Sequence, residues 1–173
     1  MKQWIDKQIH AKYTPYVLAF LIPFLVMAAV CAGHGIYPFG EDSFLHIDMY
    51  HQYAPFFMEF QRKLKAHESL MFSWNLGLGS DFVATFAYYL ASPVNWLVVF
   101  CSKQHLIEFM TVLVLLKIAC SGLFFAIYLG RHFKDNSYLV TLVSMFYALS
   151  AYISAYSWNI MWLDCLWLAP LIL

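Results

Sequence analysis

The sequence predicts an all-α integral membrane protein, and its composition is the first reason. Of its 173 residues, 62% are hydrophobic and 12% are charged, whereas a water-soluble domain carries about 25% charged residues. The second reason is a set of apolar runs of about 20 residues or more, enough for a helix to cross a hydrocarbon core of ~30 Å. The ten basic and ten acidic side chains cancel, so we expect no nucleic-acid partner.

The first membrane crossing is expected over residues 13–33. This run is uncharged and follows Lys2, Lys7 and Lys12. It is longer than the apolar part of a cleaved signal peptide, so we expect an uncleaved anchor. Because basic residues flanking a crossing stay on the cytoplasmic side, we expect a multi-pass cell-membrane protein with its N-terminus in the cytoplasm.

Residues 34–108 are expected to form a long loop on the outer face. Much of the charge of the chain lies between residues 34 and 81, which excludes a crossing there. Residues 44–66 have apolar side chains close to helical spacing, which is typical of a helix lying along the membrane interface. Residues 82–102 are uncharged but are interrupted by Ser92 and Pro93. Because proline frees backbone groups that lipid cannot satisfy, we expect a re-entrant or interfacial element there.

A basic cluster at residues 131–134 decides how the remaining apolar runs are counted. Basic loops stay in the cytoplasm. With residues 109–130 as the second crossing, 131–137 as a cytoplasmic loop and 138–158 as the third crossing, the cluster lies inside. This is the count that we favour.

The rival count makes residues 82–102 a full crossing, which puts Lys103 inside and Arg131 outside. Under either count, residues 165–173 begin another apolar run that is too short to cross. We therefore expect the start of a fourth crossing there, and a natural polypeptide of which this sequence is the truncated N-terminal part.

The densest polar cluster of the outer loop lies at residues 46–53. On a helix, Asp48, His51 and Gln52 share one face because they are three and four residues apart. That face is either the edge of an active site, where Asp48 takes a proton, or simply the wet side of an interfacial helix. In a non-helical loop, His46 could join Asp48 and His51 around a metal, so the sequence leaves open whether a divalent metal takes part.

A second acidic residue, Asp164, follows a long uncharged run beside Trp158, Asn159 and Trp162. An acid at the mouth of a membrane helix is costly, which suggests that it is used. Aromatic faces next to amides and carboxylates suit sugars, whose C–H faces stack on rings while their hydroxyls hydrogen-bond. The alternative is an aromatic belt with one snorkelling acid. The favoured count places this segment on the same outer face as residues 46–53.

Lys117 lies inside the second expected crossing. Its ammonium either pairs with a carboxylate or lipid phosphate, or extends along the helix to reach the interface. The second interpretation is the one that we favour.

Four segments in order resemble the YfhO family of bacterial multi-pass membrane proteins. The resemblance covers nearly the whole chain from residue 33 onward, and members of the family are much longer. The segments are GHGIYPFGEDSFLHIDMYHQY (33–53), SLMFSWNLGLGSDF (69–82), YYLASPVNWL (88–97) and FYALSAYISAYSWNIMWLDCLWLAPLIL (146–173).

The resemblance implies a layout similar to GT-C glycosyltransferases, a helical bundle with a long first outer loop. Those enzymes take a sugar from polyprenyl phosphate on the outer face, with one catalytic acid in the first outer loop and often another in a later one. Matched to the motifs, these catalytic roles fall on Asp48 and Asp164. The implied partners are membrane lipid, a polyprenyl-phosphate sugar donor and a cell-envelope acceptor polymer, with lipoteichoic acid of Gram-positive bacteria as the expected case.

Further residues are expected around the two acids. Arg62, Lys63 and Lys65 are candidates for the lipid phosphate, because a departing phosphate needs positive charge or a metal nearby; a cationic interfacial helix also carries such residues for headgroups. The side chains expected to bind substrate are His51, Gln52, Tyr53, Trp158, Asn159 and Trp162.

The alternative function is a non-catalytic multi-pass membrane protein, such as a transporter or an assembly subunit of an envelope pathway. A transporter places polar residues at mid-bilayer in paired broken helices. Here the polar groups gather at one face, which favours the enzyme.

Overall fold

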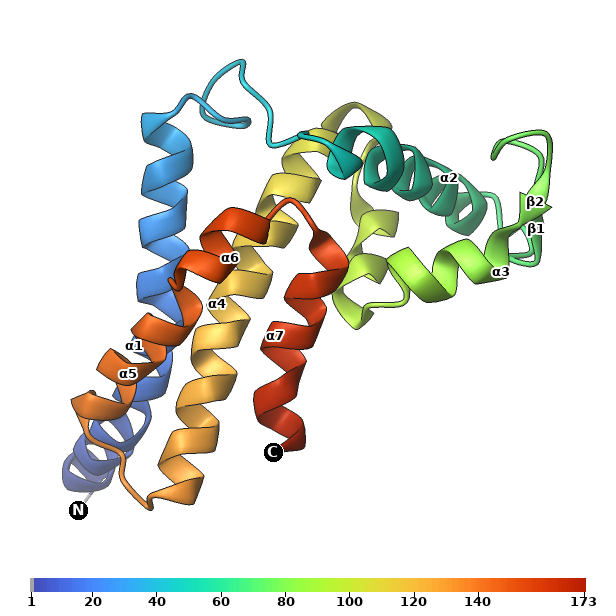
Figure 1. Ribbon diagram of the computed structural model, residues 1–173. Coiled ribbons are helices and arrows are strands. Elements are labelled where there is room, and N and C mark those ends of the chain that lie inside the picture. Colours follow the sequence, from blue (N-terminus) through green and yellow to red (C-terminus); the bar gives the residue numbers. More distant parts are fainter. Residues whose placement is uncertain (1) are drawn as a thin grey trace.

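The computed structural model describes residues 2–173, with side chains from residue 12 onward. The side chains of Lys2 and Lys7, on which the orientation prediction depends, lie outside the described residues. Figure 1 shows an upright helical bundle joined to a lateral arm, residues 49–105. The bundle contains α1 (Lys2–Gly33), α4 (Leu106–His132), α5 (Tyr138–Ala148), α6 (Ala151–Tyr156) and α7 (Ile160–Ile172). The arm contains η1 (Met49–Tyr53), α2 (Ala54–Lys65), β1 (Phe72–Ser73), β2 (Ser80–Asp81), α3 (Phe82–Thr85), η2 (Phe86–Leu90), η3 (Pro93–Phe100) and η4 (Lys103–His105).

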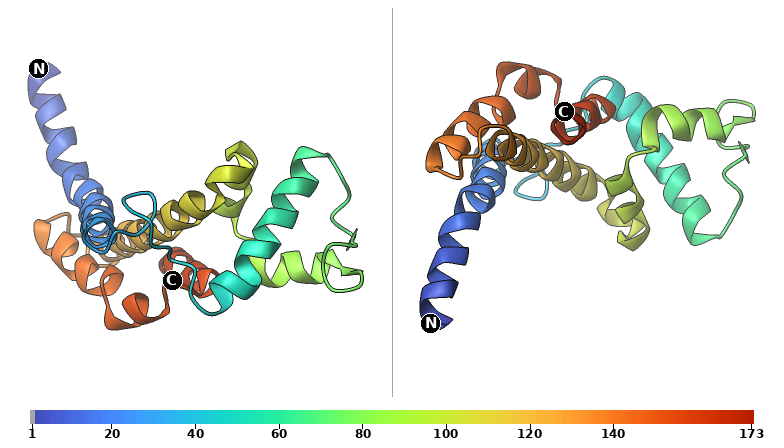
Figure 2. Two further views of the ribbon diagram at one scale, coloured as in Figure 1. Left: turned by 90° about the horizontal axis from the view of Figure 1, so that it is seen from above. Right: turned by 90° about the horizontal axis from the view of Figure 1, so that it is seen from below.

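Helix α4 lies at the centre of the bundle and packs against α1, α5 and α7. The contact with α1 is close because Gly122 has no side chain: a Cβ there would lie 2.4 Å from the carbonyl oxygen of Ala19. Small residues let membrane helices approach in this way. The views along the bundle in Figure 2 show the arm extending sideways, away from α5 and α6.

The two ends of the bundle carry different segments. The start of α1 and the connection from α4 to α5 lie at one end, whereas the loop of residues 34–48 lies at the other (Figure 1). The hydroxyl of Tyr16 on α1 donates to the side-chain oxygen of Asn136, which ties the first end together. The basic residues 131–134 therefore lie at the same end as the start of α1. The direction in which the bundle crosses a membrane stays a prediction.

Three helical segments of the described chain are long and apolar enough to cross a membrane: Lys12–Gly33, Lys103–His132 and Tyr138–Tyr156. A fourth segment, made of η2 with the preceding α3 and of η3, is bent by 108° between Leu90 and Pro93. Pro93 opens η3, a position where its missing N–H costs little.

The segment predicted as one crossing over residues 138–158 is divided into two helices. Helix α5 ends at Ala148, and α6 begins after Ser150, whose hydroxyl accepts the N–H of Ile153. A serine in this capping position satisfies a donor that the helix start leaves free. The sequence prediction missed the break because it depended on proline and glycine signals, and this break has neither.

The hairpin of β1 and β2 is fixed to α2 by buried polar groups. The carboxylate of Glu59 accepts hydrogen bonds from Ser73 Oγ (2.6 Å) and Asn75 Nδ2 (2.8 Å). The ammonium of Lys63, which is 3% exposed, donates to the carbonyl oxygen of Phe72 (2.7 Å). Buried charges need such partners, so the hairpin keeps a fixed position on the arm.

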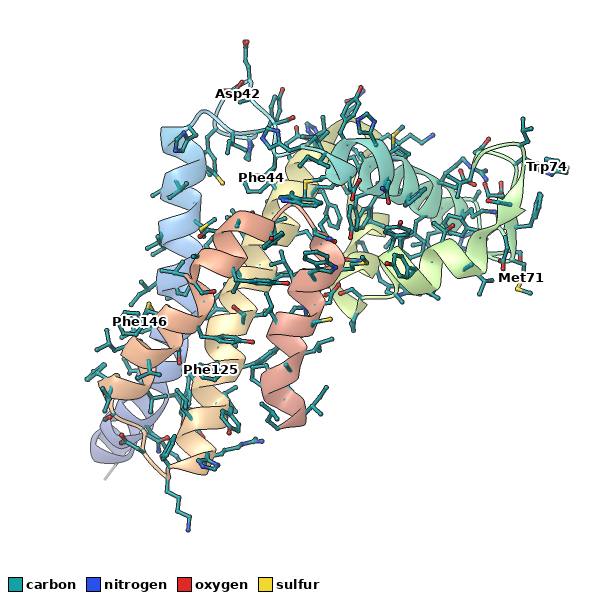
Figure 3. The ribbon with its side chains drawn as sticks, in the orientation of Figure 1. Asp42, Phe44, Met71, Trp74, Phe125 and Phe146 are labelled. Atoms are coloured by element: carbon teal, nitrogen blue, oxygen red, sulfur yellow. The ribbon has the colours of Figure 1, made fainter. Side chains whose placement is uncertain are left out.

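Large apolar side chains are exposed in both parts of the molecule. Met71 and Trp74 extend from the far end of the arm, and Phe146 points outward from α5 (Figure 3). Phe125, in contrast, stacks on Tyr147 between α4 and α5, with ring centroids 4.4 Å apart. Apolar groups on the outside of a helical bundle fit surroundings made of lipid.

Candidate functional site

The two segments predicted to carry the site meet through Tyr53. Its hydroxyl donates to the side-chain oxygen of Asn159 (2.5 Å) and accepts the N–H of Met161 (3.3 Å). Tyr53 and Asn159 are 106 residues apart in sequence and only 1% and 5% exposed. Both were expected to bind substrate. The structure buries them and bonds them to each other, so they join η1 to the start of α7.

The Asp48 turn, residues 47–52, presents a partly free carboxylate. Asp48 is half-buried, and its Oδ1 accepts a hydrogen bond from Gln52 Nε2 (2.8 Å). Within the described residues no other donor bonds to this carboxylate, so its second oxygen accepts no hydrogen bond from them. The preceding residue, Ile47, has a φ of +48°. A β-branched residue rarely adopts this left-handed conformation, and strain of this kind, about 1–3 kcal/mol, gathers at functional sites.

The electrostatic surroundings of Tyr53 connect it to both predicted acids. Burial raises the pKa of the Tyr53 phenol above its ordinary value, and the nearby Asp164 and Asp48 carboxylates raise it further. The phenol therefore stays protonated and remains a hydrogen-bond donor. Tyr89 of η2 packs edge-on against its ring, with centroids 5.5 Å apart.

The Asp164 junction, formed by Ser92, Lys117, Asp164 and Trp167, lies where α4, α7 and the bend of the arm meet. Oδ2 of Asp164 is 2.8 Å from Lys117 Nζ, and its Oδ1 accepts hydrogen bonds from Ser92 Oγ (2.6 Å) and Trp167 Nε1 (2.7 Å). Lys117 is 1% exposed. The favoured interpretation, in which Lys117 reaches the interface, is therefore wrong, and the alternative of a carboxylate partner is correct.

Sequence reasoning did not find the partners of Asp164 within this junction. Lys117 and Ser92 lie 47 and 72 residues away from it along the chain. The Ser-Pro break that marked residues 82–102 was a signal for Ser92, but only as a bend and not as a hydrogen-bond donor.

The other residues expected to bind substrate lie around these two centres. His51 is exposed and lines a pocket of about 480 Å³ between η1, α2 and the start of α4. The rings of Trp158 and Trp162 have centroids 6.4 Å apart, and Trp162 is partly exposed. Their contact with a substrate stays a prediction.

The three cations predicted to meet a lipid phosphate are all bonded within the protein. Arg62 forms paired hydrogen bonds with Glu59 (2.8 and 2.9 Å) and with Glu68 (2.6 and 2.7 Å). Buried Lys63 donates to backbone carbonyls, and Lys65 donates to a carbonyl oxygen of the segment after η3. A phosphate would have to displace these contacts, and in this structure the three cations hold the arm together.

Lys103 is a cation that the sequence analysis did not consider for phosphate binding. It is exposed and lines both the 480 Å³ pocket and an adjoining pocket of about 330 Å³. It makes no hydrogen bond or ion pair with the described residues. Its position directly after an uncharged run was a usable signal, because lysines at the ends of apolar segments face headgroups.

Among the residues that the structure describes, no three or more His, Cys, Asp and Glu side chains lie close enough to hold a metal ion. The set of His46, Asp48 and His51 depended on a non-helical loop. Residues 49–53 are helical instead, so this set is not assembled.

The family model described as bacterial membrane protein YfhO matches residues 19–173. The match includes the whole arm, both acids and Lys117. No curated protein and no solved structure matches the chain. Together with the helices long enough to cross a membrane, the match confirms the all-α integral membrane protein predicted from the sequence.

Proposed function

Because this chain belongs to the YfhO family of bacterial membrane proteins, we propose that it forms part of a GT-C-type glycosyltransferase site on the outer face of the cell membrane. The proposed donor is a sugar on polyprenyl phosphate, and the proposed acceptor is a cell-envelope polymer such as lipoteichoic acid. The observation that carries the proposal is the bond between Tyr53 and Asn159. It joins the Asp48 turn to the aromatic start of α7.

Asp48 is the proposed general base. Of the two predicted acids it is the one with an open oxygen, since its bond from Gln52 occupies only Oδ1. The acceptor hydroxyl gives its proton to Asp48 while its oxygen attacks the anomeric carbon of the donor sugar. The bond from that carbon to the phosphate oxygen breaks, and the lipid phosphate leaves with the bonding electrons.

Exposed groups in and around the two joined segments are the proposed contacts for the donor. Lys103 has no protein partner among the described residues and lines the same pocket as His51, so its charge is available to a phosphate. Trp162 is partly exposed and suits stacking against a sugar ring. In this proposal the start of α1 faces the cytoplasm, because the basic residues 131–134 lie at the same end of the bundle.

The proposal is tested with Asp48→Asn in the intact protein. The variant keeps an oxygen for the Gln52 amide but cannot take a proton. We expect sugar transfer from a polyprenyl-phosphate donor in membrane vesicles to fall by about 10²–10⁴-fold, the usual contribution of a general base, at unchanged protein abundance.

The matched control is Asp42→Asn. Asp42 belongs to the same loop but is exposed and points away from the bundle (Figure 3), so transfer should stay at the wild-type rate. Unchanged transfer in Asp48→Asn, or an equal loss in both variants, would contradict the proposal and favour a non-catalytic membrane protein.

A further inference from the structure

We propose that Asp164 is a positioning residue, and that its ion pair with Lys117 fixes the joint on which the Asp48 turn rests. The catalytic role expected for Asp164 came from a resemblance, whereas its contacts in the structure point to this different role. The activity readout of this inference rests on the proposed function. Its geometric readout does not.

Both oxygens of the Asp164 carboxylate accept bonds from protein donors. Lys117 occupies Oδ2, while Ser92 and Trp167 both donate to Oδ1. The side chain is 17% exposed. A general base needs an oxygen within hydrogen-bond reach of the substrate. Here both oxygens are engaged by protein donors, which fill three of the roughly four acceptor positions of a carboxylate.

The three donors come from three parts of the molecule. Lys117 comes from α4, Ser92 from the bend between η2 and η3, and Trp167 from α7 itself. Lys117 Nζ also donates to the carbonyl oxygen of Ile160, in the first turn of α7 (3.3 Å). One carboxylate therefore fixes the central helix, the arm and α7 relative to one another.

The path from this junction to the Asp48 turn is short. Ile160 and Met161 begin α7 directly after Asn159, one turn before Asp164. The Met161 N–H and the Asn159 side chain both bond to the Tyr53 hydroxyl. Because one helical turn is rigid, a shift at Asp164 moves these two groups and with them the support of η1.

Because Lys117 and Asp164 form an ion pair, a double variant can distinguish a positioning role of Asp164 from a role as general base. Removing one member of a buried ion pair strands the other charge without a partner, whereas removing both leaves none. If the pair acts by positioning, a neutral double variant recovers what either single variant loses. If Asp164 is itself the base, the double variant stays as inactive as the single Asp164 variant.

The test compares Lys117→Met, Asp164→Asn and the double variant, with Lys134→Met as the control for loss of an exposed lysine far from the site. In vesicles supplied with a polyprenyl-phosphate sugar, we expect each single variant to lose at least tenfold in transfer rate per protein molecule. We expect the double variant to return to within a few-fold of wild type. A double variant as inactive as Asp164→Asn overturns the inference.

The geometric readout uses spin labels at Tyr88 on η2 and Ile172 on α7, both exposed, in a variant without the native cysteines. We expect the distance distribution between the labels to broaden or shift in each single variant and to return to the wild-type distribution in the double variant. Unchanged distributions in the single variants overturn the inference. If the wild-type protein transfers no sugar, the proposed function fails. The spin-label distances alone then decide whether the pair positions α7.

Discussion

The Asp48 turn and the Asp164 junction present the same side chain in opposite settings. Asp48 is half-buried and accepts one hydrogen bond, from the Gln52 amide. The residue before it, Ile47, has a left-handed backbone conformation. Asp164 accepts bonds from three donors, one of them a buried ammonium. A carboxylate with an oxygen that accepts no protein hydrogen bond can take a proton, whereas one with both oxygens engaged holds its neighbours in place. In the proposed site, the number of donors therefore separates the acid assigned to proton transfer from the acid assigned to positioning.

The largest expected effect tests this comparison through stability. Lys117→Met should lower the free energy of unfolding by up to about 3–5 kcal/mol, because it removes the cation paired with Asp164, whose side chain is only 17% exposed. Asp48→Asn should change it by no more than about 0.5 kcal/mol, because the amide keeps an oxygen for Gln52 and no ion pair is lost. Thermal unfolding of the intact protein in lipid nanodiscs measures both. Similar losses in the two variants would remove the distinction between the two acids.

A third acid, Glu59 on the arm, sharpens the comparison because it lies outside the predicted crossings and can be titrated. The hydrogen bonds from Arg62, followed by those from Ser73 and Asn75, lower the pKa of Glu59 from 4.5 to about 2. A lowered pKa stabilises the folded protein above the ordinary value, and this contribution is lost as pH falls from about 4.5 to about 2.

Glu59→Gln should therefore cost about 1.5–3 kcal/mol at neutral pH, the range for hydrogen bonds to a charged group. The difference in unfolding midpoint between wild type and variant should shrink as the pH falls through that window. Glu41→Gln, an exposed acid of the loop of residues 34–48, is the matched control and should show no such difference. A difference between wild type and Glu59→Gln that does not change with pH would mean that the charge of Glu59 does not hold the hairpin.

The helical membrane fold was predictable from sequence because hydropathy and charge act locally. An uncharged run long enough to cross a bilayer has few alternatives to a helix, and the Ser92-Pro93 step predicts a bend. The division of residues 138–158 was not predictable in the same way, because Ser150 caps α6 without any proline or glycine.

The candidate site was predictable only in part, for a similar physical reason. Asp48 and Asp164 stand out because an acid beside an apolar run is costly wherever it lies. What each acid does depends on donors from distant parts of the chain, such as Lys117 and Ser92 for Asp164. Residue spacing along one helix carries no information about such partners.

The smallest expected effect lies in the backbone of the Asp48 turn. At Ile47 the left-handed conformation costs an L residue about 1–2 kcal/mol, which glycine avoids, while glycine loses more chain entropy on folding. Ile47 is exposed, so little apolar burial is lost. Ile47→Gly should therefore raise the free energy of unfolding by about 1 kcal/mol at most.

Transfer by Ile47→Gly should nevertheless fall, because a glycine no longer holds Asp48 in one orientation. This is the reverse of Lys117→Met, in which stability and transfer fall together. The matched control is Phe39→Gly, in the same loop, exposed, and without a left-handed backbone. It should lose about 0.4–1 kcal/mol through chain entropy, and more through the covered half of its ring. The free energy of unfolding and the rate of sugar transfer, measured on the same preparations, test this expected contrast. A stability loss in Ile47→Gly as large as that in Phe39→Gly would show that the turn stores no strain, and the contrast between the two acids would then rest on their hydrogen-bond donors alone.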